Sequence, residues 1–127
     1  MSDLFVFLWM VFFHIVDDYY LQGWLASAKQ RSYWEENAPD KKYKNDYIWA
    51  LLMHSFSWSF MIMLPIAYVQ QFNVGIGFLL IFDINVALHA FTDNMKANWR
   101  TINLWEDQFV HVGQIVMTFI YYMSGMF

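Results

Sequence analysis

Four long apolar segments separate this chain from an ordinary soluble domain. They run roughly over residues 4–22, 47–70, 74–96 and 102–123, and each has about 19 to 24 residues, enough for a helix that crosses a bilayer core. Of the whole chain, 59% is apolar and only 14% is charged, which is too apolar for a typical globular domain. The sequence therefore predicts an all-α, four-helix transmembrane bundle with antiparallel, up-down topology.

The length and the remaining composition narrow the class further. The 127 residues have room for one membrane domain, 1–127, in which the polar stretch of about 26–46 forms a longer loop between the first two helices. No basic stretch precedes the first apolar segment, so we expect this helix to be retained rather than cleaved as a signal peptide. The chain has no cysteine, which excludes disulfides and thiolate metal sites. Its net charge of -4 argues against nucleic acid as a partner.

All lysines and arginines lie in two of the three connections between the apolar segments. Basic connections normally stay in the cytoplasm, so both termini are expected outside and the long loop inside. We therefore expect a multi-pass protein of the inner, cytoplasmic membrane. The lipid bilayer is its expected partner, and assembly into a homo-oligomer stays open. The basic residues are Lys29, Arg31, Lys41, Lys42, Lys44, Lys96 and Arg100.

Each apolar segment carries one histidine, and three of the four histidines have an aspartate four residues away. This spacing puts both side chains on one face of a helix. The order reverses in the last pair, as an antiparallel bundle requires if all pairs are to reach one level of the membrane. Counted from the cytoplasmic ends, the histidines lie about 10 to 13 Å deep and the aspartates about 5 to 7 Å deep. The pairs are His14 with Asp18, His89 with Asp93, and Asp107 with His111, and the single histidine is His54.

A shared ion would explain why imidazoles and carboxylates gather at one level. An aspartate in a bilayer costs about 2.5 to 3.5 kcal/mol on insertion scales, so such groups face the bundle interior and pair with something. One His/Asp pair is more often structural, but repetition at one depth favours a divalent ion, with zinc, manganese or iron suited to these ligands. An ion-bound water would then be a source of hydroxide near neutral pH. The expected ligands are His14, Asp18, His54, His89, Asp93, Asp107 and His111.

Polar residues beside these ligands are weaker candidates. Gln22 and Lys96 continue the His/Asp faces of the first and third helices, and Lys29 follows the first helix. The two lysines could hold a phosphate or simply extend to the lipid headgroups. Asp17 could share the site or point to the headgroups, and an interhelical hydrogen bond is the only role that we find for Asp83.

These motifs resemble those of a family of small integral membrane proteins of bacteria and their phages, catalogued as domain of unknown function three-three-oh-seven. The resemblance spans nearly the whole chain, although the longer, charged first loop and two extra aspartates depart from the family pattern. It implies the four-helix membrane fold and adds two glutamines to the site, but it brings no known activity. The matching residues are His14, Asp18 and Gln22 in "HIVDDYYLQ", then Lys29, His54, His89, Asp93 and Lys96, and finally Asp107, Gln108 and His111 in "DQFVH".

Three functions fit this pattern. The first is metal-dependent hydrolysis of a lipid-linked or amphipathic phosphoester at the cytoplasmic leaflet, with phosphate held by Lys96 and Lys29. The second is a non-enzymatic phage or bacterial membrane factor, for host takeover, exclusion or lysis, whose polar cluster only fixes helix packing. The third is a b-type haem protein with two histidine ligands, which leaves the aspartates unexplained. The catalytic carboxylates in the first reading are those of Asp18, Asp93 and Asp107.

Overall fold

The computed structural model describes residues 1–127 and is all-α, with six α-helices and no strand. The four long helices cover the four apolar segments of the sequence. They are α1 (Asp3–Ile15), α4 (Asp46–Val69), α5 (Ile76–Asn94) and α6 (Leu104–Met123). A π-helical segment, η1 (Val16–Leu21), prolongs α1, and a second, η3 (Met95–Trp99), prolongs α5.

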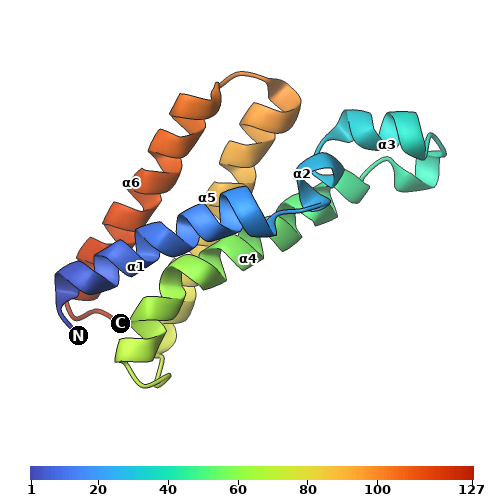
Figure 1. Ribbon diagram of the computed structural model, residues 1–127. Coiled ribbons are helices and arrows are strands. Elements are labelled where there is room, and N and C mark those ends of the chain that lie inside the picture. The colour runs from blue at the N-terminus through green and yellow to red at the C-terminus, as the bar shows by residue number, and fades with distance from the viewer.

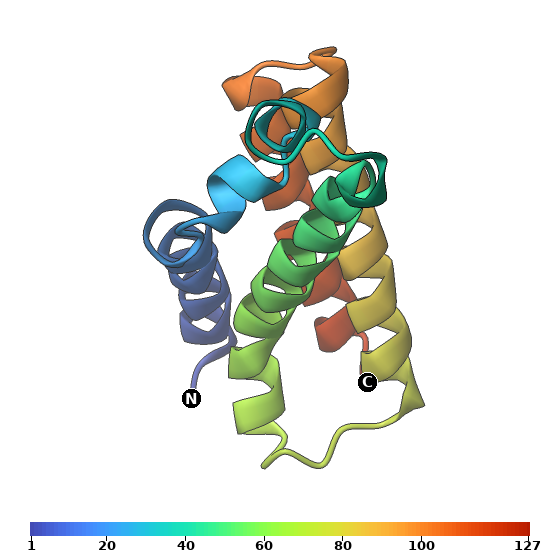
Figure 2. The ribbon, with the colours of Figure 1, turned by 90° about the vertical axis from the view of Figure 1, so that its right-hand side faces the viewer.

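The long helices alternate in direction, and both termini lie at the same end of the molecule (Figure 1). Helix α4 packs against both α1 and α5, and α6 completes the bundle by contacting α5 and α1. Figure 2 shows the same arrangement from the side, with α6 behind α4. The apolar core is the cluster of Val6, Met10, Trp58, Ile62, Met63, Ile66, Ala67, Phe78 and Ile115. The polar residues singled out by the sequence lie beyond Trp58, toward the end opposite the termini.

Three helical segments are long and apolar enough to cross a membrane: Asp3–Leu21, Lys41–Val69 and Ile76–Trp99. Helix α6, the fourth expected span, does not reach the same hydropathy. Its first half includes Glu106, Asp107 and Gln108, and such polar residues lower the mean hydropathy of the whole segment. The structure thus has three candidate membrane spans.

The connection between α1 and α4 is more ordered than a plain loop. It contains α2 (Leu25–Ala28), α3 (Arg31–Asn37) and a short 3-10 turn, η2 (Lys41–Tyr43). Helix α3 ends shortly before Pro39, because a proline disfavours helical backbone at the residue that precedes it. The side chain of Asn98 ties the connection to η3, since its Oδ1 accepts from the Arg31 backbone at 2.7 Å and its Nδ2 donates to the Lys29 carbonyl at 3.0 Å.

Asp83 differs from expectation. It lies on the exposed face of α5 and makes no side-chain hydrogen bond, so it has no interhelical partner within the chain. The residue two positions later, Asn85, takes the inward position, because neighbouring residues of a helix point in different directions.

Candidate metal centre

The predicted His/Asp pairs all point into the bundle. The side chains of the seven expected ligands are each 7% exposed or less. Within the three pairs, the closest nitrogen–oxygen distances are 3.6 Å for His14 and Asp18, 3.7 Å for His89 and Asp93, and 3.4 Å for His111 and Asp107. The expectation that these groups face the interior of the bundle is therefore confirmed.

The centre of the cluster is a row of alternating imidazole Nε2 and carboxylate Oδ1 atoms. In order, the row is His54, Asp18, His89, Asp93, His111 and Asp107, with successive distances of 3.2, 3.9, 3.7, 3.2 and 3.4 Å. Helices α4, α5 and α6 and the segment η1 each contribute to it. Residues distant in sequence thus form one continuous set of ligand atoms.

Each carboxylate in this row has its second oxygen, Oδ2, held by a donor. Gln108 Nε2 donates to Asp18 at 3.1 Å, and Lys29 Nζ donates to Asp93 at 2.5 Å. The Oδ2 of Asp107 accepts from Lys96 Nζ at 2.6 Å and from Gln108 Nε2 at 3.1 Å. These bonds fix the orientation of the carboxylates, so that Oδ1 of each one faces the imidazoles.

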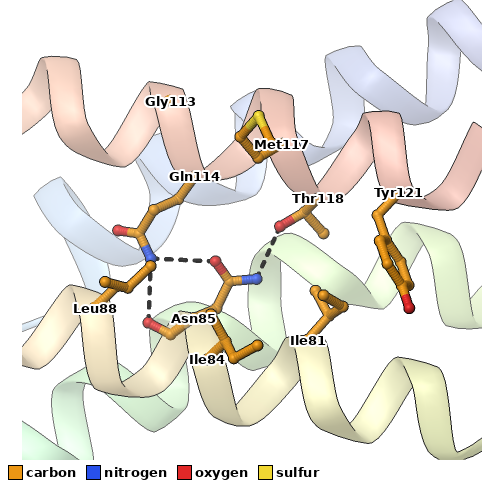
Figure 3. Close-up of a pocket in the computed structure, with 9 residues that line it drawn as sticks. All are labelled: Ile81, Ile84, Asn85, Leu88, Gly113, Gln114, Met117, Thr118 and Tyr121. Atoms are coloured by element: carbon orange, nitrogen blue, oxygen red, sulfur yellow. Dashed lines mark hydrogen bonds between the residues drawn. The ribbon is translucent and has the colours of Figure 1, made fainter.

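A chain of hydrogen bonds from Gln114 through Asn85 to Thr118 (Figure 3) fixes which nitrogen of His111 carries a proton. The Nε2 of Gln114 donates to the backbone and side-chain oxygens of Asn85, and Asn85 donates in turn to Thr118 Oγ1 at 2.8 Å. The amide oxygen of Gln114 must therefore face His111 Nδ1, at 3.2 Å, and accept a hydrogen bond from it. A neutral His111 consequently presents the lone pair of Nε2 to the carboxylates of Asp93 and Asp107. Outer partners of this kind orient metal-binding histidines in proteins.

His54 has a carboxylate beside its Nδ1 atom, where His111 has the amide oxygen of Gln114. The Oδ2 atom of Asp17 lies 3.6 Å from His54 Nδ1, while its Oδ1 accepts from Ser57 Oγ at 2.5 Å. Asp17 is 1% exposed, so it does not extend to the membrane surface and is part of the site. The π-helical geometry of η1 accounts for this, since its wider turn allows the adjacent Asp17 and Asp18 both to point inward.

His14 is held differently from the other three histidines. The indole Nε1 of Trp58 donates to His14 Nδ1 at 2.8 Å, and His14 Nε2 lies 3.1 Å from the amide oxygen of Gln108. Both ring nitrogens are thus hydrogen-bonded within the protein. This geometry favours a positioning role for His14 on Gln108 over direct ligation of an ion.

Several buried side-chain atoms of the residues in the row make no hydrogen bond. They include Nε2 of His54, both ring nitrogens of His89 and Oδ1 of Asp107. Unpaired buried polar atoms are rare in proteins and call for an explanation such as a bound ion. With bonds of about 2.1 Å, neighbouring ligands of a four- to six-coordinate ion lie about 3.0 to 3.4 Å apart, close to the spacings in the row. The residues present therefore fit a divalent metal ion.

The two lysines expected at the membrane surface both bind site carboxylates. Lys29 is 5% exposed, so it is not extended to the headgroups, while the side chain of Lys96 is 28% exposed. Together with Arg100, they line an open depression of about 550 Å³, which also includes Gln22 and Gln30. Gln22 itself bonds only the backbone carbonyl of Asp18, at 3.0 Å. Positive charge thus collects beside the carboxylates.

Four residues of the site were missed or weighed too lightly by sequence reasoning: Asp17, Ser57, Trp58 and Gln114. Helical spacing could have found two of them, because Trp58 follows His54 by four residues and Gln114 follows His111 by three. Trp58 stacks on His89, with ring centroids 4.2 Å apart. The contribution of Ser57 depends on an interhelical contact, which a single sequence does not indicate.

Replacing Gln114 by leucine should weaken ion binding about 10- to 100-fold, because His111 loses the acceptor that fixes its proton. The free energy of unfolding should also fall by about 1 to 3 kcal/mol, since buried donors and acceptors lose their partners. Thr118→Val is the matched control, because it removes only the outermost bond of the chain. The Thr118→Val variant should bind the ion with nearly the affinity of the wild-type protein. Competition with a chelator of known affinity measures the difference, and equal affinities in the two variants would contradict the orienting role.

The chain has no match among protein-family models, curated proteins or solved structures.

Proposed function

We propose that the protein is a four-helix integral membrane protein in which α6 is the fourth span. The exposed face of α6 supports this, because it is almost wholly apolar where it would contact lipid. Trp105 is 86% exposed, Phe109 81% and Met117 65%. The polar residues that lower the hydropathy of α6, such as Asp107 and Gln114, are instead buried inside the bundle. A helix of this kind is stable in a membrane once its polar face is covered by other helices.

In this proposal both termini face the outside and the long connection faces the cytoplasm. The termini share one end of the molecule (Figure 1). All the basic residues lie in the α1–α4 and α5–α6 connections, at the other end. The positive-inside rule then places the centre near the inner leaflet of the cytoplasmic membrane. The likeness of the motifs to domain of unknown function three-three-oh-seven belongs to the same proposal.

At this centre the protein binds a divalent metal ion and hydrolyses a lipid-linked or amphipathic phosphoester. The observation that carries the proposal is the set of buried atoms without a hydrogen bond on His54, His89 and Asp107, beside a depression lined by cations. A bound zinc, manganese or iron ion lowers the pKa of coordinated water enough for hydrolysis near neutral pH. Asp18, Asp93 and Asp107 would supply carboxylate oxygens to bound metal, and Lys96 and Arg100 orient an anionic group that enters the depression.

An amphiphilic substrate suits the two openings of the site. The cation-lined depression lies beside Asp93 and Asp107, and an apolar groove of about 480 Å³ runs between α1 and α6. Val11, Ile15 and Val112 line this groove, and His14 and Gln108 also border it. Gln108 bonds Asp18 and Asp107, so one side chain of the groove wall contacts the centre. A phosphate could therefore approach through the depression and an acyl chain through the groove.

The packing of the imidazoles gives the haem alternative no support. His89 lies between Trp58 and His111, and its ring centroid is 4.0 Å from that of His111. Stacked rings at this distance leave no space for a porphyrin between them.

Hydrolysis of defined lipids tests the hydrolase. Protein reconstituted with Zn²⁺ or Mn²⁺ should release phosphate from a short-chain lipid phosphomonoester or diphosphate, or cleave a short-chain lipid phosphodiester into an alcohol and a phosphomonoester, and a chelator should stop the reaction. Asp18→Asn should lose this activity at least 100-fold, because it removes a ligand and a carboxylate together. Asp83→Asn, on the exposed face of α5, is the matched control. A metal-loaded wild type that cleaves none of the three classes would favour the non-enzymatic membrane factor.

A further inference from the structure

The ligand atoms of the centre form two groups rather than one. Those of Asp18, His54 and His89 lie within 4.8 Å of one another, and so do those of His89, Asp93 and His111, but the five do not form a single group at this spacing. One ion with bonds of about 2.1 Å would hold all its ligand atoms within about 4.2 Å of one another. The row is therefore longer than the coordination sphere of one ion.

Asp93 is placed to join the two groups. Its Oδ1 lies 3.2 Å from His111 Nε2, and its Oδ2 lies 3.5 Å from His54 Nε2. The two oxygens of one carboxylate thus face the two histidines that lie on either side of His89 in the row. Lys29 also contacts Oδ2, but a carboxylate oxygen has two lone pairs and can serve both a donor and an ion.

The far end of the row has a ligand that a single ion at Asp18 and His54 would not use. Asp107 is fully buried, and its Oδ1 makes no hydrogen bond although it lies 3.4 Å from His111 Nε2. The other oxygen is held by Lys96 and Gln108. An unpaired carboxylate oxygen directed at an imidazole nitrogen needs a cation between them, which is either a proton on His111 Nε2 or a bound ion.

We propose that the centre binds two divalent ions bridged by the Asp93 carboxylate. One ion lies at Asp18, His54 and His89, and the second lies at Asp93 and His111, with Asp107 beside it. This inference rests on the proposed metal-binding function and gives it a stoichiometry. Four aspartates at the site, including Asp17, face two lysines, so two divalent ions leave an excess of positive charge that an anionic phosphoester would balance. Paired ions that clamp a phosphate in this way are common in enzymes of phosphoryl transfer.

The number of ions per chain tests the inference. Wild-type protein purified in Mn²⁺ or Zn²⁺ without chelator should contain two ions per chain by elemental analysis. Asp107→Asn and Asp18→Asn should each reduce the content to one, whereas the exposed control Asp83→Asn should keep two. The Mn²⁺ form should give the electron paramagnetic resonance spectrum of an exchange-coupled pair, because one carboxylate links the ions.

The outcomes separate the two proposals. One ion per wild-type chain, or two ions without magnetic coupling, would overturn the bridged pair and leave the metal-binding function standing. No ion at all would overturn both. The number of ions and their magnetic coupling are both measured on the wild-type protein, so these results hold even if a variant fails to fold.

Discussion

Replacing Asp93 by asparagine should remove metal from the protein and lower the free energy of unfolding by about 3 to 5 kcal/mol. The carboxylate contacts His54, His89 and His111, and it is the only acidic partner of Lys29. Asparagine keeps the size of the side chain but carries no charge, so the ammonium of Lys29 is left buried without a counter-ion. Metal content by elemental analysis and unfolding in mixed detergent micelles measure the two effects.

A second substitution separates the two losses. Lys29→Met removes the unpaired charge, so the double variant Asp93→Asn with Lys29→Met should recover most of the lost stability. It should still bind no metal, because the bridging carboxylate is absent. A single Asp93→Asn variant that retains its ions would exclude Asp93 as a ligand. A double variant as unstable as the single one would show that the Lys29 pair is not the source of the instability.

Much of the fold follows from the sequence because the dominant signals are local. Apolar runs of membrane length fix the four long helices, and the helical spacing of His89 and Asp93 fixes the face that turns inward. Helix α6 is the long helix that is not apolar enough to count as a candidate span. The residues that lower its hydropathy are also residues that indicate the site. Asp107 and His111 carry the polar signal of the centre and also lower the hydropathy of α6.

The details of the site depend on contacts between helices, which spacing alone does not reveal. Sequence reasoning gave His14 and His111 the same role, but Trp58 and Gln108 occupy both nitrogens of His14. It also left open whether Asp17 shares the site or points to the headgroups. A regular helix turns Asp17 and Asp18 in different directions. The π-helical turn η1 changes that geometry, and nothing in the apolar pattern indicates it.

Removal of metal should lower the melting temperature of the wild-type protein on the order of 10 °C. An ion that binds only the folded state, at a free concentration of about 1,000 times its dissociation constant, stabilises that state by about 4.1 kcal/mol, and for a chain of this length such a change shifts melting by roughly that amount. Melting in detergent after dialysis against a chelator, and again after restoring Zn²⁺ or Mn²⁺, measures the effect. Asp83→Asn should respond like the wild type.

His89→Phe distinguishes a metal centre from a cluster that only fixes helix packing. Phenylalanine can keep the stacking of His89 between Trp58 and His111, whose ring centroids lie 4.2 and 4.0 Å away, but it has no ring nitrogen. Neither nitrogen of His89 makes a hydrogen bond, so without metal the substitution breaks no bond within the protein. With Zn²⁺ or Mn²⁺ present, the melting temperature of the variant should lie well below that of the wild type, and a chelator should lower it less. A wild type that melts at the same temperature with and without chelator, together with a His89→Phe variant of equal stability, would identify the cluster as structural.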